Sequence, residues 1–379
     1  MKELDQILRL WKKAEASGES AVLATVVKTE GSSYRLPGAR LLLLANGQRA
    51  GSISGGCLED DLIKKARWLT EPGPVLRRYD TNSDGEIGSG FGLGCGGVVH
   101  VLLERLTPGD PTVLAVIRDT RSQRRPAAIA HLILPAPVAG ERLVVDANGT
   151  ITNNIGDAEL ANSLELACQL ALSERASRTM HGNEAVEAFI EVTTPPVRLL
   201  VFGAGDDAVP VTDLANHIGW QVWVFDGRAH YARAERFPQA DRVILRPTGS
   251  RGVIPQIDPW TAAVLMSHSY AQDLDAFREL SGAGLNYLGV LGPQKRTRQL
   301  LFDAGVQEAR FGEALHGPMG LDIGADGPEQ VAIAVIAEIQ ATLNGREGGL
   351  LRDRRGSIHS REDASAEPES AWLQTACAE

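Results

Sequence analysis

The carboxyl-terminal half of the chain alternates apolar runs with helical patterns, and this alternation limits the possible folds most. An apolar run over 198–202 precedes the turn Gly203-Ala-Gly205-Asp-Asp-Ala208, a helical pattern to His217 and a second apolar run over 221–225. Further strands are predicted at 242–245, 262–266 and 287–291, with helices at 273–280, 295–304 and 328–343. Strands that alternate with helices favour a doubly wound parallel sheet with an α/β architecture.

The turn after the first predicted strand has the spacing of a dinucleotide-binding fingerprint. Its GxGxxA pattern is an accepted variant, and Asp226 lies 21 residues after Gly205, near the place where an acid binds a ribose hydroxyl. The sequence therefore predicts a Rossmann-like domain with Gly203, Gly205 and Asp226 at a nucleotide. Asp206 and Asp207 oppose this ligand, because carboxylates in the first helical turn repel a pyrophosphate.

Other polar candidates also follow predicted strands of this sheet. His268 and the Gly292-Pro-Gln-Lys295-Arg296 turn fall, with Asp226, at the carboxyl edge, where such sheets bind their ligands. Lys295 and Arg296 begin a predicted helix and oppose its dipole unless an anion lies between them, which favours a phosphate site. The alternative for His268 is an ordinary hydrogen-bonded edge residue.

Two glycine-rich clusters in the amino-terminal half each carry one cysteine. They are Gly51-Ser-Ile-Ser-Gly-Gly-Cys57-Leu-Glu59 and Gly90-Phe-Gly-Leu-Gly-Cys95-Gly-Gly97. Glycine weakens helices and strands, so such density indicates tight turns or a backbone that approaches a ligand closely. A helix is predicted over 58–69, which places the Cys57 thiol near a helix N-terminus, where its pKa can fall. These clusters predict a small-molecule site.

The elements around the clusters predict a mixed α/β amino-terminal domain. We expect a helix over 3–16, a strand over 21–27, and a hairpin over 41–53 whose Asn46-Gly47 forms a type I′ turn. Strands are predicted at 75–79 and 98–103, and they flank a long polar loop. Loops of this length in compact domains are usually functional or disordered. Between 110 and 194 we predict helices at 112–121 and 158–174 and strands at 127–134 and 142–145, and we find no chemical motif there.

Length and composition agree with two globular domains. We expect domains over 1–108 and 197–344, an intervening α/β segment over 109–192 packed with the first, a linker at 193–196 and a disordered tail over 345–379. A net charge of −10 argues against nucleic-acid binding. No leader pattern and no apolar run long enough for a membrane span are found, so we expect a cytoplasmic protein.

The four cysteines show no CxxC spacing, so neither a disulfide framework nor a structural zinc site is predicted. Cys168 lies on an apolar helical stripe and Cys377 lies in the tail, and both are expected to be inert. Only Cys57 and Cys95 have a setting that suggests chemistry.

Taken in order along the chain, the motifs resemble those of the XdhC/CoxI family of molybdoenzyme accessory proteins. The amino-terminal resemblance rests on Gly31-Ser-Ser-Tyr34-Arg35-Leu-Pro37-Gly38-Ala-Arg40, on Gly51 to Asp60 and on Gly-Leu-Gly-Cys95-Gly-Gly97. The carboxyl-terminal resemblance rests on Gly203-Ala-Gly205, Asp226-Gly-Arg228, Gly292-Pro-Gln-Lys295-Arg296 and Pro318-Met-Gly-Leu-Asp322-Ile-Gly324. Asp206-Asp207 departs from the family pattern.

The resemblance implies a maturation factor that binds molybdenum cofactor, protects it during sulfuration and inserts it into an apoenzyme. Its partners would be a xanthine dehydrogenase-like or carbon monoxide dehydrogenase-like apoenzyme and a cysteine desulfurase as sulfur donor, and a homodimer is left open. It also implies a set of cofactor-binding positions, with Cys57 and Cys95 in contact with sulfur or molybdenum. The positions are Tyr34, Arg35, Gly38, Arg40, Ser54, Gly55, Gly56, Glu59, Gly94, Gly96, Gly97, Gly203, Gly205, Asp226, Arg228, His268, Lys295, Arg296, Asp322 and Gly324.

The residue types suit such a ligand, because molybdenum cofactor joins a flat pterin and a dithiolene to an anionic phosphate. Gly55, Gly56 and the next helix N-terminus would supply amide donors, while Arg35 and Arg40 would supply positive charge. The plainer interpretation is that these arginines pair with surface carboxylates. Likewise, Glu59 either stabilises the first helical turn or orients a ligand.

The sequence leaves two other functions open. GxGxxA and Asp226 support a nicotinamide-dependent oxidoreductase, whereas Asp206-Asp207 and the lack of an evident proton relay oppose it. A sulfur- or nucleotidyl-transferase acting on the cofactor is the second alternative. The absence of a GxxxxGK[ST] loop weighs against nucleotidyl transfer.

Overall fold

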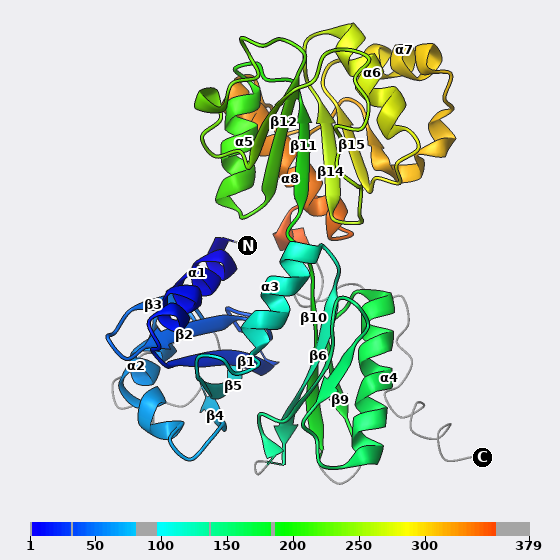
Figure 1. The fold of residues 1–379 in the computed structure, drawn as a ribbon. Helices are drawn as coiled ribbons and strands as arrows, with labels where there is room; N and C mark the ends of the chain where they lie inside the picture. The colour runs from blue at the N-terminus through cyan, green and yellow to red at the C-terminus, as the bar shows by residue number, and fades with distance from the viewer. Residues whose placement is uncertain (1, 32, 81–96, 136–137, 183–185, 354–379) are drawn as a thin grey trace, which may run out of the picture. The chain divides into compact units, whose positions relative to one another are not determined.

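A computed structural model describes residues 2–31, 33–80, 97–135, 138–182 and 186–353. The chain forms two compact units, one from residues 1–197 with 216–221 and one from 198–215 with the residues after 221. Figure 1 shows the helices and strands of each unit, coloured by residue number. Within the described ranges, no helix is long and apolar enough to cross a bilayer.

The first unit begins with an antiparallel sheet in the order β3-β2-β1-β5-β4. Helix α2 packs its apolar side chains on one face of this sheet, with Leu58 and Leu62 against Val99 and Val101. The elements match the predicted ones closely: α1 (Lys2–Ala16), β1 (Ala21–Gly31), β2 (Arg40–Leu44), β3 (Arg49–Gly51), α2 (Cys57–Leu69), β4 (Val75–Asp80) and β5 (Gly97–Leu106).

The predicted type I′ turn in the β2–β3 hairpin is wrong. Only Gly47 has a positive φ, of 84°, whereas a type I′ turn needs a positive φ at Asn46 as well. Gly47 N–H donates to Leu44 O at 3.1 Å and Leu44 N–H donates to Gln48 O at 2.9 Å. The loop therefore has three residues and one left-handed glycine, a common alternative that also suits the twist of a hairpin.

A second antiparallel sheet completes this unit, in the order β8-β7-β6-β10-β9. The predicted helices and two of its strands are confirmed, while β8, β9 and β10 were missed because two are short and the third contains buried acidic residues. The elements are α3 (Val113–Gln123), β6 (Ala127–Leu134), β7 (Arg142–Val145), β8 (Ile151–Asn153), α4 (Ala158–Glu174), β9 (Arg178–His181) and β10 (Glu187–Thr193).

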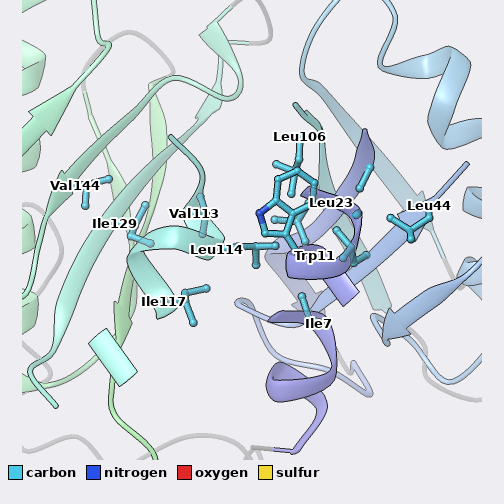
Figure 2. Close-up of a cluster of buried hydrophobic side chains, with 13 residues drawn as sticks. Ile7, Trp11, Leu23, Leu44, Leu106, Val113, Leu114, Ile117, Ile129 and Val144 are labelled. Carbon is cyan, nitrogen blue, oxygen red and sulfur yellow. The ribbon is translucent and has the colours of Figure 1, made fainter. Parts of the chain in front are cut away.

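Helices α1 and α3 bring apolar side chains to a core that both sheets share (Figure 2). Trp11 of α1 and Ile117 of α3 belong to one cluster with Leu23 of the first sheet and Ile129 of the second. The other face of the second sheet is covered by α4, where Cys168 is buried and burial raises the pKa of its thiol to about 12. The position of Cys168 in the core is thus confirmed, whereas Cys377 lies outside the described residues.

Three ion pairs also join the two sheets of this unit. Arg40 pairs with Glu191, Arg142 with Glu104, and Lys28 with Glu187. Each pair takes one residue from the first sheet and one from the second, so the interface between the sheets is partly ionic.

The second unit has a six-stranded sheet in the order β13-β12-β11-β14-β15-β16, with the pairs β12–β13, β11–β14, β14–β15 and β15–β16 parallel. The predicted Rossmann-like, doubly wound arrangement is confirmed. Helices α6 and α7 pack on one face, and Figure 1 shows α8 behind the strands. The elements are β11 (Arg198–Phe202), α5 (Ala208–His217), β12 (Gln221–Asp226), β13 (Arg242–Leu245), β14 (Thr261–Leu265), α6 (Tyr270–Leu280), β15 (Tyr287–Val290), α7 (Gln294–Ala304), β16 (Leu315–His316) and α8 (Pro328–Leu343).

The predicted tail falls mostly outside the described ranges. Residues 345–353 are described and end in a short 3-10 helix, Leu351–Asp353, while the prediction of disorder for 354–379 lies beyond them.

Candidate functional site

The antiparallel pairing of the first sheet gathers the amino-terminal motifs at one of its ends. Strand β1 ends at Gly31, β2 begins at Arg40, β3 ends at Gly51 and β5 begins at Gly97. Gly31 is the register partner of Gly97, and Leu41 is that of Gly51. Segments far apart in sequence therefore lie at the same end of the sheet, with the Gly31–Gly97 pair farther along β1 than Thr25, the register partner of Arg40. This end is the candidate cofactor site.

Neither of the two predicted thiols lies among the described side chains. Cys95, with Gly94 and Gly96, lies outside the described residues, and for Cys57 only the backbone is described, at the first position of α2. Gly97 is buried where β5 begins.

Glu59 organises the glycine loop that precedes α2. Its carboxylate accepts hydrogen bonds from the amides of Ile53, Ser54 and Gly56 at 2.9–3.0 Å and from the hydroxyls of Ser52 and Ser54. Burial raises the pKa of this carboxyl, but the Ser54 and Ser52 hydroxyls and the loop amides outweigh that effect and lower the pKa to about 2. Glu59 thus occupies three loop amides, and one of them, that of Gly56, is an amide that the sequence assigned to an anion.

Arg35 is tied to the amino-terminal helix. Its Nη2 lies 2.7 Å from Glu3 Oε2, and Glu3 Oε1 accepts a hydrogen bond from the Ser52 amide at 2.6 Å. One carboxylate of α1 therefore links the two motif segments, and the plainer interpretation of Arg35 as half of an ion pair is supported.

Arg40 is buried and paired with Glu191 of β10. Nη1 donates to Glu191 Oε1 at 2.7 Å and to Gly38 O at 2.8 Å, and Nη2 bonds Glu191 Oε2. His131 Nε2 lies 3.1 Å from Glu191 Oε2. The predicted phosphate contact of Arg40 is therefore replaced by an internal ion pair, since both its charge and its donors face protein.

Tyr34 remains exposed beside the glycine loop, and Leu36, two residues further on, is exposed as well. Tyr34 is 68% exposed, and a Cβ built on Gly55 would lie 3.8 Å from its ring, so the ring packs against the Gly55 backbone. Gly55 and Gly56 are themselves exposed, and Gly56 has a φ of 125°. The available surface is thus aromatic and apolar, next to open backbone.

In the second unit, the predicted candidates do meet at the carboxyl edge of the parallel sheet. Asp226 ends β12, His268 follows β14 and the Gly292 turn follows β15. The first glycine of the fingerprint serves packing, because a Cβ on Gly203, with φ 131°, would lie 2.4 Å from Met266 O. A Cβ on Gly205 would lie 2.5 Å from Asp207 Oδ1.

Asp226 is buried and bonded to the protein on both oxygens. Oδ1 accepts from the Arg228 amide and Nε at 2.9 Å each, and Oδ2 accepts from the Ala204 amide at 2.9 Å and from Arg228 Nη2 at 2.7 Å. Burial raises the pKa of Asp226, but the Arg228 and Ala204 bonds dominate and lower it. The carboxylate that would hold a ribose is already saturated.

The prediction that Asp206 and Asp207 stand in the first turn of the helix is wrong, since α5 begins at Ala208. Asp207 Oδ2 lies 2.8 Å from His268 Nε2, and Asp206, 98% exposed, pairs with Arg236 at 2.6 Å. His268 has a φ of 54°, uncommon for a residue with a side chain. The Asp207–His268 pair joins the turn after β11 to the residues after β14, where the strand order reverses and where sheets of this kind bind ligands. The Asp206–Arg236 pair instead joins the turn to the segment after β12.

Arg296 is also neutralised internally. Its Nη2 lies 2.6 Å from the buried Asp273, which removes the dipole conflict that favoured a phosphate at this residue. Lys295 is exposed, and no ion pair is found for it within the described part of the chain. Asp322 and Gly324 lie on an exposed loop whose neighbour Gly320 donates its amide to Glu338 at 2.7 Å.

Sequence reasoning missed the carboxylates that neutralise the predicted cations: Glu3, Glu191 and Asp273. Glu191 carries a readable signal, because a single acid within the apolar run Ala188 to Val192 indicates a charge with a dedicated partner. Among the described residues, no cluster of three or more His, Cys, Asp or Glu side chains is arranged to hold a metal ion.

The fold and the site define a class of two-part α/β proteins, with an antiparallel sheet that carries glycine motifs and a Rossmann-like unit. Residues 14–80 match the family model of the XdhC and CoxI family, and residues 199–339 match that of the XdhC Rossmann domain. The chain belongs to the XdhC/CoxI family.

Relatives match along most of this chain. A Bacillus subtilis protein, named as a probable subunit of xanthine dehydrogenase, is 34% identical over 325 residues, which cover 86% of this chain and 93% of the relative. The "Molybdenum cofactor insertion chaperone PaoD" of Escherichia coli is 25% identical and covers 96% of this chain and 92% of its own. A Bacillus halodurans crystal structure described as a xanthine dehydrogenase superposes with a TM-score of 0.73 at 28% identity, covering 90% of this chain and 96% of that one.

Proposed function

We propose that this protein is a maturation factor that binds molybdenum cofactor, shields it while sulfur is added, and inserts it into a molybdenum hydroxylase of the xanthine dehydrogenase type. The observation that carries the proposal is the meeting of the family motifs at one end of the first sheet, with the Tyr34 ring exposed against Gly55. The similarity to a chaperone named for cofactor insertion supports the same role.

The described residues fit one part of this cofactor better than another. A flat pterin suits the open aromatic face of Tyr34, the half-exposed Leu36 and the exposed backbone of Gly55 and Gly56. The phosphate does not suit Arg35 or Arg40, whose charges are paired with Glu3 and Glu191. In the proposed complex these residues therefore hold the pterin, and the cofactor supplies the molybdenum centre that the client enzyme needs.

The geometry of the second unit favours this role over a nicotinamide-dependent oxidoreductase. The acid expected to hold a ribose is saturated by Arg228, and the fingerprint turn carries two carboxylates. A ligand with a pyrophosphate would have to displace both arrangements and meet like charge. We propose that the client is a xanthine or aldehyde dehydrogenase-like apoenzyme and that a cysteine desulfurase donates sulfur.

Purification from a molybdenum-replete host tests the function. The expected result is bound molybdenum and pterin in about equal amounts, with transfer to an apo-hydroxylase that restores its activity. Separate Cys57→Ser and Cys95→Ser variants, with Cys168→Ser as the control thiol, show whether sulfur chemistry needs either cluster. Metal and pterin at background levels in the wild-type protein would refute the proposal.

Turnover distinguishes a carrier from an enzyme that modifies the cofactor. A carrier exchanges its cargo once for each protein molecule, while a sulfur- or nucleotidyl-transferase produces modified cofactor in excess over protein when given a persulfide donor or CTP. We expect the stoichiometric result.

A further inference from the structure

We propose that Glu191, in the second sheet of the first unit, is a positioning residue that fixes the motif turn 34–40 for cofactor binding. The inference rests on the proposed function and extends it to a strand that carries no family motif. Glu191 acts through Arg40 and has no contact with the ligand itself.

A single guanidinium connects Glu191 to the turn. Arg40 Nη1 lies 2.7 Å from Glu191 Oε1 and 2.8 Å from Gly38 O, so the same nitrogen holds the carboxylate and the turn's carbonyl. The Gly38 amide donates to Val26 O at 2.8 Å, and the Val26 amide donates to Ala39 O at 2.9 Å. The turn is therefore held by β1 from one side and by Arg40 from the other.

Gly38 allows this close approach. Its φ is 94°, a conformation that glycine adopts without strain, and a Cβ at this position would lie 3.5 Å from Glu191 Oε1. The motif glycine thus lies directly beside the carboxylate of the second sheet.

The arrangement is charged and largely closed to water. The Arg40 and Glu191 side chains are 4% and 8% exposed, and His131, at 1%, contacts Glu191 Oε2 and stacks on Phe189 with ring centroids 6.0 Å apart. Burial raises the pKa of Glu191, while Arg40 and His131 counteract that effect and lower it to about 2. The carboxylate stays ionised at neutral pH, and Arg40 cannot turn outward without leaving a buried charge unpaired.

A second ion pair of the same type offers a matched control. Glu104 of β5 is equally buried and binds Arg142 of β7, which also joins the two sheets. Within the described ranges, neither Glu104 nor Arg142 makes a hydrogen bond or an ion pair to the motif turn, since Glu104 bonds Arg142 and the Arg142 amide donates to Asn154. If these pairs served only to hold the sheets together, removal of either carboxylate would have the same effects.

Glu191→Gln and Glu104→Gln are compared in the full-length protein with three measurements. Thermal unfolding reports stability, amide hydrogen exchange of Gly38 reports the turn, and retention of molybdopterin reports the site. We expect both variants to lose stability, but only Glu191→Gln to speed Gly38 exchange and to weaken molybdopterin binding, each by about tenfold. Arg40→Lys, which keeps the charge but loses the forked geometry, is expected to reproduce the defect if Glu191→Gln does not fold.

The outcomes separate this inference from the proposed function. If Gly38 exchange is the same in the Glu191 and Glu104 variants, or if both retain molybdopterin like the wild type, the positioning role is wrong. If the wild-type protein retains no molybdopterin, the proposed function fails, and Gly38 exchange alone then decides whether Glu191 fixes the turn.

Discussion

Arg228 folds back onto Asp226, with Nε 2.9 Å from Oδ1 and Nη2 2.7 Å from Oδ2. In a dinucleotide-binding sheet the acid at this position holds a ribose, and a nearby arginine accommodates a 2′-phosphate. Here the two groups satisfy each other, and the same carboxylate also accepts the Ala204 amide of the glycine turn. The fingerprint therefore indicates the fold correctly, while the groups that would bind a nucleotide form hydrogen bonds within the protein.

The first prediction concerns nucleotides at this turn. Calorimetric titration of the wild-type protein with NADH, NADPH and ADP is expected to show no saturable binding below about 1 mM. The combined Asp206→Ser and Asp207→Ser variant is expected to bind ADP more tightly, because it removes two carboxylates from the pyrophosphate position. Asp326→Asn, an exposed acid outside the turn, serves as the control. Sub-millimolar binding of any of these nucleotides to the wild type would show that the internal pairs open readily.

The second prediction concerns acid stability. The Glu59 pKa is about 2 in the folded protein and about 4.5 as a free side chain, so its contribution is present above pH 4.5 and is lost as the pH falls towards 2. Glu59→Gln is expected to cost on the order of 3 kcal/mol at pH 7 and to make the acid limb of the stability profile less steep.

The control for Glu59 is its exposed neighbour. Asp60→Asn is expected to stay within about 0.5 kcal/mol of the wild type at pH 7. Urea unfolding at intervals between pH 2 and pH 7 measures both variants. An acid limb that is unchanged in Glu59→Gln would mean that the loop does not depend on this carboxylate.

The third prediction separates the ring of Tyr34 from its hydroxyl in the first motif. Tyr34→Ala is expected to lower pterin retention by about tenfold, because one stacking contact is lost, while Tyr34→Phe keeps the retention of the wild type. Both variants are expected to unfold like the wild type, since the ring is largely exposed. Fluorescence of the released, oxidised pterin gives the measurement. A loss in Tyr34→Phe equal to that in Tyr34→Ala would point to the hydroxyl instead of the ring.

The fourth prediction tests why the first fingerprint glycine is needed. Gly203→Ala combines a φ of 131° with a contact of 2.4 Å to Met266 O, so it is expected to cost at least about 3 kcal/mol. Gly249→Ala has a φ of 89° and open space, and is expected to cost about 1–2 kcal/mol for conformation alone. The comparison uses the free energy of unfolding of both variants in denaturant, monitored by a signal from the second unit. Equal losses of stability in the two variants would show that the contact with Met266 O adds no cost beyond that of the backbone conformation.

The elements of the second unit were readable because their signals are local. The apolar run 198–202, the glycine turn and the run that ends at Asp226 lie within thirty residues, and the predicted helix 328–343 matches α8 at both ends. Strand β10 was missed, because Glu187 and Glu191 interrupt its apolar pattern and are buried beside Lys28 and Arg40. A single acid in an apolar run indicates that a partner is needed, but only the folded chain shows that the partner of Glu191 is Arg40.

Local patterns along the chain were sufficient to identify the family, the parallel sheet and the motif residues, since periodicity and glycine turns depend on near neighbours. Tertiary structure decided which of those residues are free to bind. Arg40 finds Glu191 at a separation of 151 positions, and Arg35 finds Glu3 at a separation of 32. A charge loses its availability to a ligand when a partner neutralises it in a poorly solvated place, and only the folded chain brings such partners together.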